Sequence, residues 1–445
     1  MKSTPNYVFK FLSYYLDRRS LVATFCYQGI DNFIFTEKIT FAPNPSGKKF
    51  NPSEDPNLDA LLDRALFLSF ILIGTSYFKT HPTKNVHIDL PLDHFQAHFF
   101  NQVFQQGLSQ YAFENQLTRE QLAHFFATPN YLAPDPLPYQ GKGILSLQSG
   151  GKDSLLTAAL LTERHLDFTP WYVSSDPKLT HPAVIDSFFD HTDQPKAASI
   201  ALRELDLEHL RRPGSLNGHV PVTFILQSLA LIQVILNHQQ AVLTSIGQEG
   251  NEPHAFIGDL PVNHQWSKTW EAEQLFIAYV KRYLSSNLIV GSPLRGMSEL
   301  LIAEQFVKKC WQRYGYSFSS CNRANYKQQS DNHLLKWCGD CPKCANSYLL
   351  FCPFLPPQLL QSLFADQDLF QKESLIKTFK GLLGVDGVMK PFECIGSLDE
   401  LRTAYHHRQS GYSALPFPVP TTHYNYRQPY PIQSEIVELF NRPAL

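Results

Sequence analysis

Apolar and polar residues alternate along the first forty positions of the chain. Three stretches, FKFLSYYL, LVATFCY and FIFTEKITF, place apolar residues at nearly every second position, a period typical of strands with one buried face. Two longer stretches, at about 57–74 and 93–110, repeat apolar residues with a helical period. The pattern predicts an N-terminal α+β region, residues 1–135, with an antiparallel sheet and two helices.

From Ile144 onward, short apolar runs are separated by helical ones. The runs ILSLQ, PWYVSS, AASIAL and AVLTSI are typical of buried strands, whereas TFILQSLALIQVILNH and a stretch from about residue 154 are typical of helices. This alternation favours an α/β fold, a doubly wound parallel sheet whose strand ends bind ligands. We predict such a domain over residues 140–310, after the proline-rich linker ATPNYLAPDPLPYQGKG.

The last third of the chain, residues 311–445, shows no single period. A helical stretch follows residue 346, and proline and tyrosine are frequent towards the end. We predict a mostly helical C-terminal region that carries a metal module.

Charge and hydropathy weigh against two classes of partner, nucleic acids and membranes. Lys and Arg number 38 against 40 Asp and Glu, so the chain offers no excess of positive charge to a nucleic acid backbone. The longest apolar run, ALFLSFILIG, is about half a membrane span, and the first residues are too broken by polar positions for a signal peptide. We expect a cytoplasmic protein with no membrane and no nucleic acid partner.

A glycine turn joins the strand at Ile144 to the following helix. Its bare backbone N–H groups and the helix N-terminus converge on one point that attracts an anion, most naturally a polyphosphate. It is not the common NTPase loop, because Ser146 and Asp153 stand where that loop has Gly and Ser or Thr. A turn that only caps the helix is the alternative. The candidate polyphosphate-binding residues are Ser149, Gly150, Gly151, Lys152, Asp153 and Ser154.

The strand–SGGxDS–helix arrangement resembles the ATP pyrophosphatase (PP-loop) superfamily. Members cleave ATP between the α and β phosphates and place AMP on a carboxylate or carbonyl oxygen. The resemblance implies a PP-loop fold for residues 140–310.

A cysteine cluster follows the predicted α/β domain. Cys338, Cys341 and Cys344 have C-x2-C-x2-C spacing, which lets three thiolates face one ion, and Cys321 is the fourth candidate ligand. Four thiolates suit a structural zinc ion; an iron–sulfur cluster and unligated buried thiols are the alternatives. Three further cysteines and Cys394, in KPFECIG, are expected to be ordinary buried residues; the three are Cys26, Cys310 and Cys352.

Several segments are polar and aromatic where a plain core would be apolar. In chain order with the motifs above they read SYFK, SGGKDS, LNGHVPVT, VNHQWSK, FSSCNR, WCGDCPKC and KPFEC. This series resembles the family of UDP-N-acetylmuramoyl-L-alanyl-L-glutamate epimerases over roughly residues 70–397. The loop Gly247–Ala255 matches the family only loosely, and its place after a strand end makes it a candidate for substrate selectivity.

The resemblance implies inversion of the terminal glutamate of UDP-MurNAc-L-Ala-L-Glu, after a ligase has added L-Glu. The reaction consumes ATP, uses Mg²⁺, and releases AMP and pyrophosphate. Adenylation explains why ATP is needed. The α-proton beside a carboxylate is very weakly acidic, whereas the α-proton beside an acyl-adenylate is more acidic.

Roles for single residues follow from this chemistry. Gly150, Gly151 and Ser154 would cradle pyrophosphate, Lys152 would neutralise phosphate charge, and Asp153 would hold Mg²⁺. Proton transfer is expected first from His264 and His219, then from Cys321 and Glu299. Expected substrate-binding residues are Asn217, Asn263, Lys268, Arg295 and Glu299.

Two other functions remain open. The adenylate could be captured by an amine or ammonia, as in the deazaguanine nitrile synthases, which share the turn and a four-cysteine cluster with different spacing. A tRNA-modifying enzyme is the second, although the near-neutral charge weighs against RNA binding.

Overall fold

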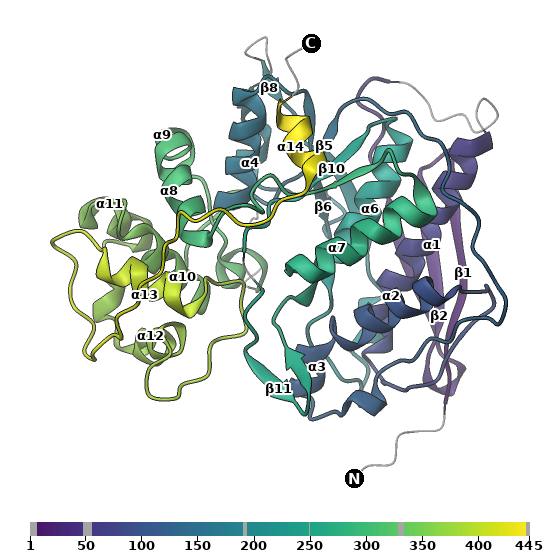
Figure 1. The fold of residues 1–445 in the computed structure, drawn as a ribbon, viewed down its shortest axis with the longest axis horizontal. Coiled ribbons are helices and arrows are strands. Elements are labelled where there is room, and N and C mark those ends of the chain that lie inside the picture. The colour runs from purple at the N-terminus through teal and green to yellow at the C-terminus, as the bar shows by residue number, and fades with distance from the viewer. Residues whose placement is uncertain (1–6, 48–55, 190–193, 249, 328–332, 442–445) are drawn as a thin grey trace.

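The structure is a computed structural model that describes residues 7–47, 56–189, 194–248, 250–327 and 333–441. Figure 1 shows two parts side by side. The sheet part, residues 7–310, holds a large sheet and the helices that flank it, and the helical part, residues 311–433, is a cluster of helices. The C-terminal helix leaves this cluster and returns to the sheet part (Figure 1).

One sheet of nine strands runs through the sheet part, in the order β13-β10-β5-β6-β9-β3-β2-β1-β4. The pairings from β13 to β9 are parallel, those from β9 to β1 are antiparallel, and β4 lies parallel to β1. The fold is therefore mixed α/β with a mostly parallel sheet. The strands are β1 (Phe9–Asp17), β2 (Val22–Gln28), β3 (Ile34–Thr40), β4 (Val86–Ile88), β5 (Ile144–Leu147), β6 (Phe168–Ser174), β9 (Ser199–Glu204), β10 (Ala241–Leu243) and β13 (Ile289–Gly291).

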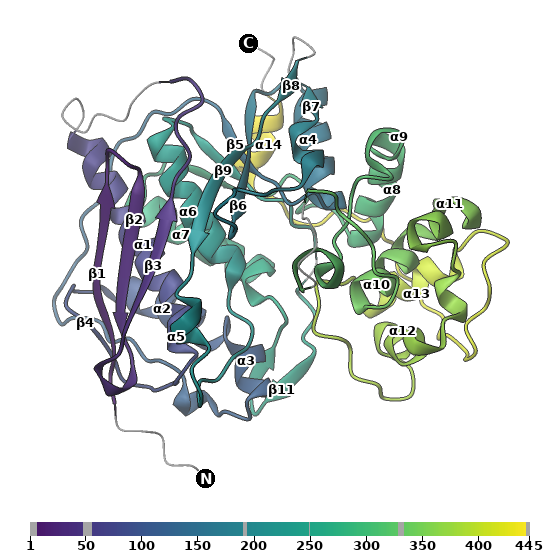
Figure 2. The same cartoon turned by 180° about the vertical axis from the view of Figure 1, so that it is seen from behind.

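The antiparallel strands β1–β3 confirm the prediction from period-two alternation. Phe9, Phe11 and Phe25 point into a buried aromatic core, whereas Leu12 and Tyr15 are exposed on the opposite side. Figure 2 shows this outer side of β1, β2 and β3 without a covering helix. The sheet continues without a break from β3 into β9, and the division of the chain at residues 135–140 stays a prediction.

Helices cover both faces of the parallel half of the sheet. Leu145 and Val242 belong to one buried core and their neighbours Ile144 and Ala241 to the other, so successive residues of a strand face opposite sides. The first core packs against α1 (Pro56–Phe78), α2 (His94–Gln105), α6 (Val222–Leu236) and α7 (Trp270–Tyr279). The second packs against α4 (Lys152–Glu163), which contacts α8 (Glu299–Lys309). The helices predicted near 57–74 and 93–110 are confirmed as α1 and α2.

The remaining elements are short or belong to the helical part. Across the described stretches, no helix is both long and apolar enough to span a membrane. The helical part contains no strand among its described residues. The further elements are α3 (Ser109–Glu114), β7 (Phe188–Phe189), β8 (Pro195–Lys196), α5 (Leu207–Leu210), β11 (Ala255–Ile257), β12 (Leu260–Val262), α9 (Trp311–Tyr314), α10 (Pro342–Phe351), α11 (Pro357–Gln361), α12 (Ile376–Leu383), α13 (Leu398–His406) and α14 (Ser434–Asn441).

The order of the parallel strands creates a switch point. The chain runs from β5 to β6 and β9 on one side, then returns to place β10 and β13 on the other side of β5. Connections therefore leave the carboxyl ends of β5 and β10 in opposite directions, which opens a crevice between them.

Candidate active site

The glycine turn lies at this switch point, between β5 and α4. Gly150 has a φ of +74°, and a Cβ there would lie 2.5 Å from Leu335 Cδ1, so only glycine fits. Gly151 is the N-cap of α4 and has no side chain to bond the first-turn N–H groups. The Ser154 hydroxyl donates to the Gly151 carbonyl (3.1 Å) and accepts from the Ser149 N–H (3.3 Å), which closes the turn.

Lys152 begins α4 and lies between two carboxylates. Its Nζ donates to Asp153 Oδ1 at 2.5 Å and to Glu299 Oε2 at 2.7 Å. The side chains of Lys152 and Glu299 are each only 6% exposed. Glu299 opens α8, and its N–H donates to Glu400 Oε1 of the helical part (2.8 Å). One buried cation therefore joins the turn to a carboxylate across the crevice.

A pocket of about 300 Å³ opens at this point. Its floor comes from the ends of β5 and β10, and its walls come from the turn Gln265–Lys268 and from the helical part. Gln148 is buried in the floor, and its Oε1 has no hydrogen-bond partner in the part of the chain that the structure describes. An acceptor left in this state points to a polar ligand.

A second pocket, of about 490 Å³, continues the first across the ends of β6 and β9. Both pockets share residues of β5, α6 and the Gln265–Lys268 turn, so they form one long groove along the carboxyl edge of the parallel strands. Its far end contains Tyr172 and Arg203. The groove has room for more than one ligand group, consistent with a reaction between two substrates.

Histidines gather beside the groove. The rings of His219 and His264 are 4.7 Å apart, and His254 lies 6.5 Å from His264. His264 Nδ1 is 2.7 Å from Gln110 Oε1, whereas His219 Nε2 is shielded from solvent and has no partner among the described residues. His219 and His264 were predicted together, and the structure brings them together.

The histidines are held neutral by their surroundings. Burial, with Lys268 adding positive charge, lowers the pKa of both His219 and His264 to about 3. Burial also lowers the pKa of His254 to about 3. Each imidazole is therefore unprotonated at neutral pH, and the same burial makes it a weaker base than a free histidine.

Lys79 forms hydrogen bonds with the segment that carries His219. Its Nζ donates to Asn217 Oδ1 (2.7 Å) and to the Gly218 carbonyl (3.1 Å), and burial lowers its pKa to about 8. Asn217 is exposed, and its side chain holds Lys79 in this structure. Asn263 is buried beside His264, and its Oδ1 has no bond to any described residue.

Arg295 lies under the pocket wall. It is fully buried, bonds Glu273 through Nε (2.8 Å), and donates through Nη1 to the carbonyls of Gly247 (2.5 Å) and Lys268 (3.0 Å). These contacts fix the backbone of the two loops that line the pocket. Arg295 does not line the pocket itself, whereas Lys268 and Glu299 do. The loop 247–255 begins at this contact, and its Glu249 lies outside the described residues.

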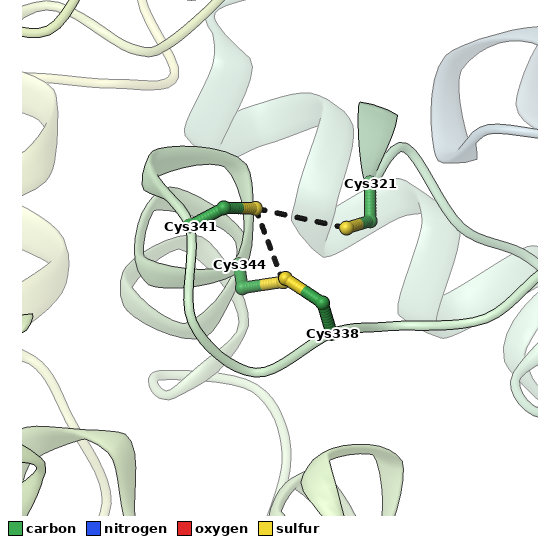
Figure 3. A group of neighbouring side chains, drawn as sticks. All are labelled: Cys321, Cys338, Cys341 and Cys344. Carbon is green, nitrogen blue, oxygen red and sulfur yellow. Dashed lines mark hydrogen bonds between the residues drawn. The ribbon is translucent and has the colours of Figure 1, made fainter. Parts of the chain in front are cut away.

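The four predicted metal ligands converge in the helical part (Figure 3). Their sulfur atoms lie within 4.8 Å of one another, with separations of 3.5 Å (Cys341–Cys344), 3.6 Å (Cys321–Cys341) and 3.7 Å (Cys338–Cys344). Four metal–sulfur bonds of about 2.3 Å in a tetrahedron place sulfurs about 3.8 Å apart. The geometry therefore fits a single tetrahedral ion.

The cysteine cluster forms the back of the pocket wall. Ser320 and Asn322, on either side of Cys321, line the pocket, and so does Lys343, next to Cys344. The Ser319 N–H donates to the Gly150 carbonyl (3.3 Å), which ties this wall to the glycine turn. An ion at the four thiolates would therefore hold a wall of the site rather than face its cavity, and Cys321 is not among the pocket-lining residues.

Several residues of the pocket and of the histidine cluster were not predicted as functional. Lys343 and Cys394 line the pocket, and His254 joins the histidines. Cys310 and Cys352 are buried as expected, but Cys394 is only partly buried, as is Cys26, which corrects the expectation for both. Cys394 stands in KPFEC, so the signal was present in a motif to which no role was given.

Comparisons with known proteins agree on one family. Family models described as the MurL N-terminal domain and the MurL C-terminal domain match residues 1–289 and 317–414. A protein of Xanthomonas oryzae pv. oryzae is 32% identical over 400 residues, 89% of this chain and 84% of that protein. One of a Micromonospora species is 34% identical over 399 residues, 88% of this chain and 84% of that protein. Both are named UDP-N-acetyl-alpha-D-muramoyl-L-alanyl-L-glutamate epimerase.

Proposed function

The chain belongs to the MurL family of UDP-N-acetyl-alpha-D-muramoyl-L-alanyl-L-glutamate epimerases, and on this premise we propose that it inverts the terminal L-glutamate of UDP-MurNAc-L-Ala-L-Glu to D-glutamate. The reaction consumes ATP, releases AMP and pyrophosphate, and serves peptidoglycan precursor synthesis in the cytoplasm. One observation supports the proposal: the glycine turn and the buried Lys152 line one pocket with Lys268, in a chain 32–34% identical to named epimerases.

The glutamate carboxylate is the group to be activated. Its oxygen attacks the α-phosphorus of ATP, forming an acyl-adenylate and releasing pyrophosphate. The α-proton is then removed into the acyl system without placing a second negative charge beside a carboxylate. A proton returns to the opposite face, and water attacks the acyl carbon and releases AMP.

The turn residues suit the phosphate end of this reaction. Gly150, Gly151 and Ser154 present a turn and helix N-terminus to the groove, and the resemblance to PP-loop enzymes assigns them to pyrophosphate. Lys152 stabilises the charge that develops on the leaving phosphate, after exchanging its contact with Asp153 for the phosphate oxygens. Asp153 is then free to hold Mg²⁺, which supplies further positive charge at the phosphates.

The histidines and basic groups suit the glutamate end. His264 and His219 are assigned to accept the α-proton, because both are unprotonated and their rings lie together at 4.7 Å. Lys268 lines both pockets and is the candidate for an anionic group of the substrate, with Asn217 and Asn263 at the edge of the histidine cluster. Glu299 is assigned to orienting Lys152, and Arg295 to fixing the Lys268 backbone.

The four cysteines are proposed to hold one structural zinc ion. The 3.5–3.7 Å sulfur separations support one ion rather than an iron–sulfur cluster, whose cysteines bind several iron atoms and stand further apart. Zinc would supply no chemistry to the reaction, only a fixed position for the wall that carries Ser320 and Asn322.

Incubation with ATP, Mg²⁺ and UDP-MurNAc-L-Ala-L-Glu tests the proposal. Acid hydrolysis and chiral chromatography should find D-glutamate, and AMP and pyrophosphate should form only when the dipeptide substrate is present. In deuterated water the inverted glutamate should carry deuterium at Cα. Omitting ATP is the control and should abolish inversion.

Two outcomes would replace this function. A new amide or nitrile with AMP as co-product would assign the protein to the adenylate-forming ligases. ATP-dependent modification of tRNA, with salt-sensitive RNA binding, would assign it to tRNA-modifying enzymes. Inverted glutamate without deuterium would contradict the deprotonation step.

A further inference from the structure

A short segment of the helical part crosses to the histidine cluster. This strap, Lys390–Cys394, follows α12, and Lys390 Nζ pairs with Glu252 at 2.5 Å. The Phe392 ring stacks on His254 at 5.2 Å and contacts Phe113 at 5.7 Å. The strap therefore lies against the same side of the sheet part as the histidines.

The end of the strap is fixed at the pocket. Asn322 Nδ2 donates to Glu393 Oε2 at 3.4 Å, and Lys343 Nζ donates to the Cys394 carbonyl at 2.5 Å. These contacts hold the backbone on both sides of the Cys394 side chain. Its thiol faces the pocket, where Lys268 Nζ lies 3.3 Å from Sγ.

Lys268 links the thiol to the histidines. Its ammonium lies close enough to His219 and His264 to disfavour their protonation. The same ammonium lies 3.3 Å from the Cys394 sulfur. Lys268 and the Cys394 thiol line the pocket, where the buried Gln148 Oε1 has no partner among the described residues, and the histidines lie behind Lys268 outside the lining.

We propose that Cys394 is a catalytic residue that gives a proton to Cα of the activated glutamate, on the face opposite to the histidine base. The inference rests on the proposed epimerase function and adds a residue to it. A two-base inversion needs groups on two sides of the planar intermediate, and the histidine turn and the strap supply them.

The proton balance closes without another reactant. The neutral imidazole takes the α-proton and becomes imidazolium, while the electron pair of the broken C–H bond enters the acyl group. The Cys394 S–H then gives its proton to Cα, and the electron pair returns to form the new C–H bond. The sulfur is left as a thiolate beside Lys268, and solvent restores both groups by taking one proton and giving one.

Cys394→Ala separates this role from folding and from adenylation. The variant should form AMP and pyrophosphate from ATP and UDP-MurNAc-L-Ala-L-Glu within about threefold of the wild-type rate and invert glutamate at least about 100-fold more slowly. In deuterated water it should exchange the α-proton of the L-substrate with retention, because the histidine base still removes and returns it. Exchange of the D-epimer should be lost.

Two further variants sharpen the result. His264→Asn should show the opposite pattern, with exchange of the D-epimer retained and exchange of the L-epimer lost; if His219 is the base, His219→Asn shows it instead. Cys26→Ala, which changes a partly buried cysteine on the outer side of the antiparallel strands, should match the wild type in every assay.

Each outcome decides the proposal. Inversion at the wild-type rate by Cys394→Ala overturns it, as does loss of AMP formation together with inversion or loss of exchange from both epimers. A wild-type protein that makes AMP but never D-glutamate would instead overturn the epimerase function on which the inference rests.

Discussion

The sheet part and the helical part contribute to the same pocket by different means. In the sheet part, the glycine turn and the Gln265–Lys268 turn are held by strand ends and by the buried Arg295. In the helical part, the pocket-lining residues flank the cysteine cluster or belong to the strap, without a strand among the described residues. The sheet side is thus fixed by the folded chain itself, whereas the helical side would depend on the ion proposed at the four cysteines. The two sides should therefore respond to different perturbations.

Asp153→Asn should give the largest effect and affect chemistry alone. Removing the Asp153 charge should lower pyrophosphate release about 1,000-fold, because the carboxylate that would hold Mg²⁺ at the phosphates is lost. The melting temperature should stay within about 2 °C of the wild type. A pyrophosphate assay checks the rate, with the exposed Asp167→Asn as control. Wild-type release by Asp153→Asn would contradict an ATP site in the sheet part.

Cys341→Ser should affect stability first and activity through it. Loss of one of four thiolates should lower the free energy of unfolding by about 3 kcal/mol, roughly a quarter of the binding energy of a structural zinc site. Elemental analysis should find one zinc per wild-type chain and less in the variant, and urea unfolding gives the stability. An active, stable wild-type protein without metal would remove the difference between the two parts.

A change of pH should act on the sheet part through its histidines. The folded pKa of His219, about 3, lies below its unfolded value of 6.5, so the unfolded chain binds more protons between these values. The contribution of His219 to the free energy of unfolding is therefore fully present above pH 6.5 and is lost as the pH falls towards 3. From pH 7 to pH 5 the histidine should cost about 2 kcal/mol.

Urea unfolding of the wild type and of His219→Asn at pH 7 and pH 5 measures the contribution of His219 to the free energy of unfolding. The variant should lose about 2 kcal/mol less than the wild type on acidification. His406→Asn, at an exposed histidine of the helical part, should change nothing in this difference. Equal losses in all three proteins would show that the histidine cluster is not held neutral.

Ser319→Ala should give the smallest effect. It measures how much one hydrogen-bonding hydroxyl next to the cysteine cluster contributes to stability. The hydroxyl donates to the Lys336 carbonyl (2.7 Å) and accepts from the Cys321 N–H (3.0 Å). Its loss should cost about 1 kcal/mol in urea unfolding and leave the zinc content unchanged. The exposed Ser362→Ala is the control. A loss of zinc on Ser319→Ala would show that the hydroxyl, and not only the thiolates, organises the cluster.

Local patterns predicted the elements well. Strands β1–β3 follow from their period, because one face of each is buried, whereas α6 follows from a long apolar run that is buried on nearly all sides. Strand β13 was not predicted; like β10 it is a buried strand of three residues, too short to show a period. The pairing of β3 with β9 also went unpredicted, because it joins segments far apart along the chain, whose alternation specifies a face but no partner.

The site residues likewise fall into those that local motifs predicted and those that they did not. The glycine turn and the four cysteines were predicted because each is a local motif whose spacing states its chemistry. Cys394 and His254 reach the site only through packing of the strap and the loop after β10, which spacing does not encode. Arg295 was expected to bind substrate because an arginine in a polar segment suits anions. Its burial with Glu273 depends on the position of α7, which the sequence does not state.

The pairing of β3 with β9 can form only late in synthesis of the chain. Strand β3 ends at Thr40 and β9 begins at Ser199, so the ribosome adds about 160 residues between them, in roughly 8–30 s at typical rates. Through that interval β1–β3 have no neighbour at the β3 edge, and such an edge pairs readily with other chains. Nascent chains are therefore most exposed to aggregation before β9 emerges, and fragments ending before it should need a chaperone to stay in solution.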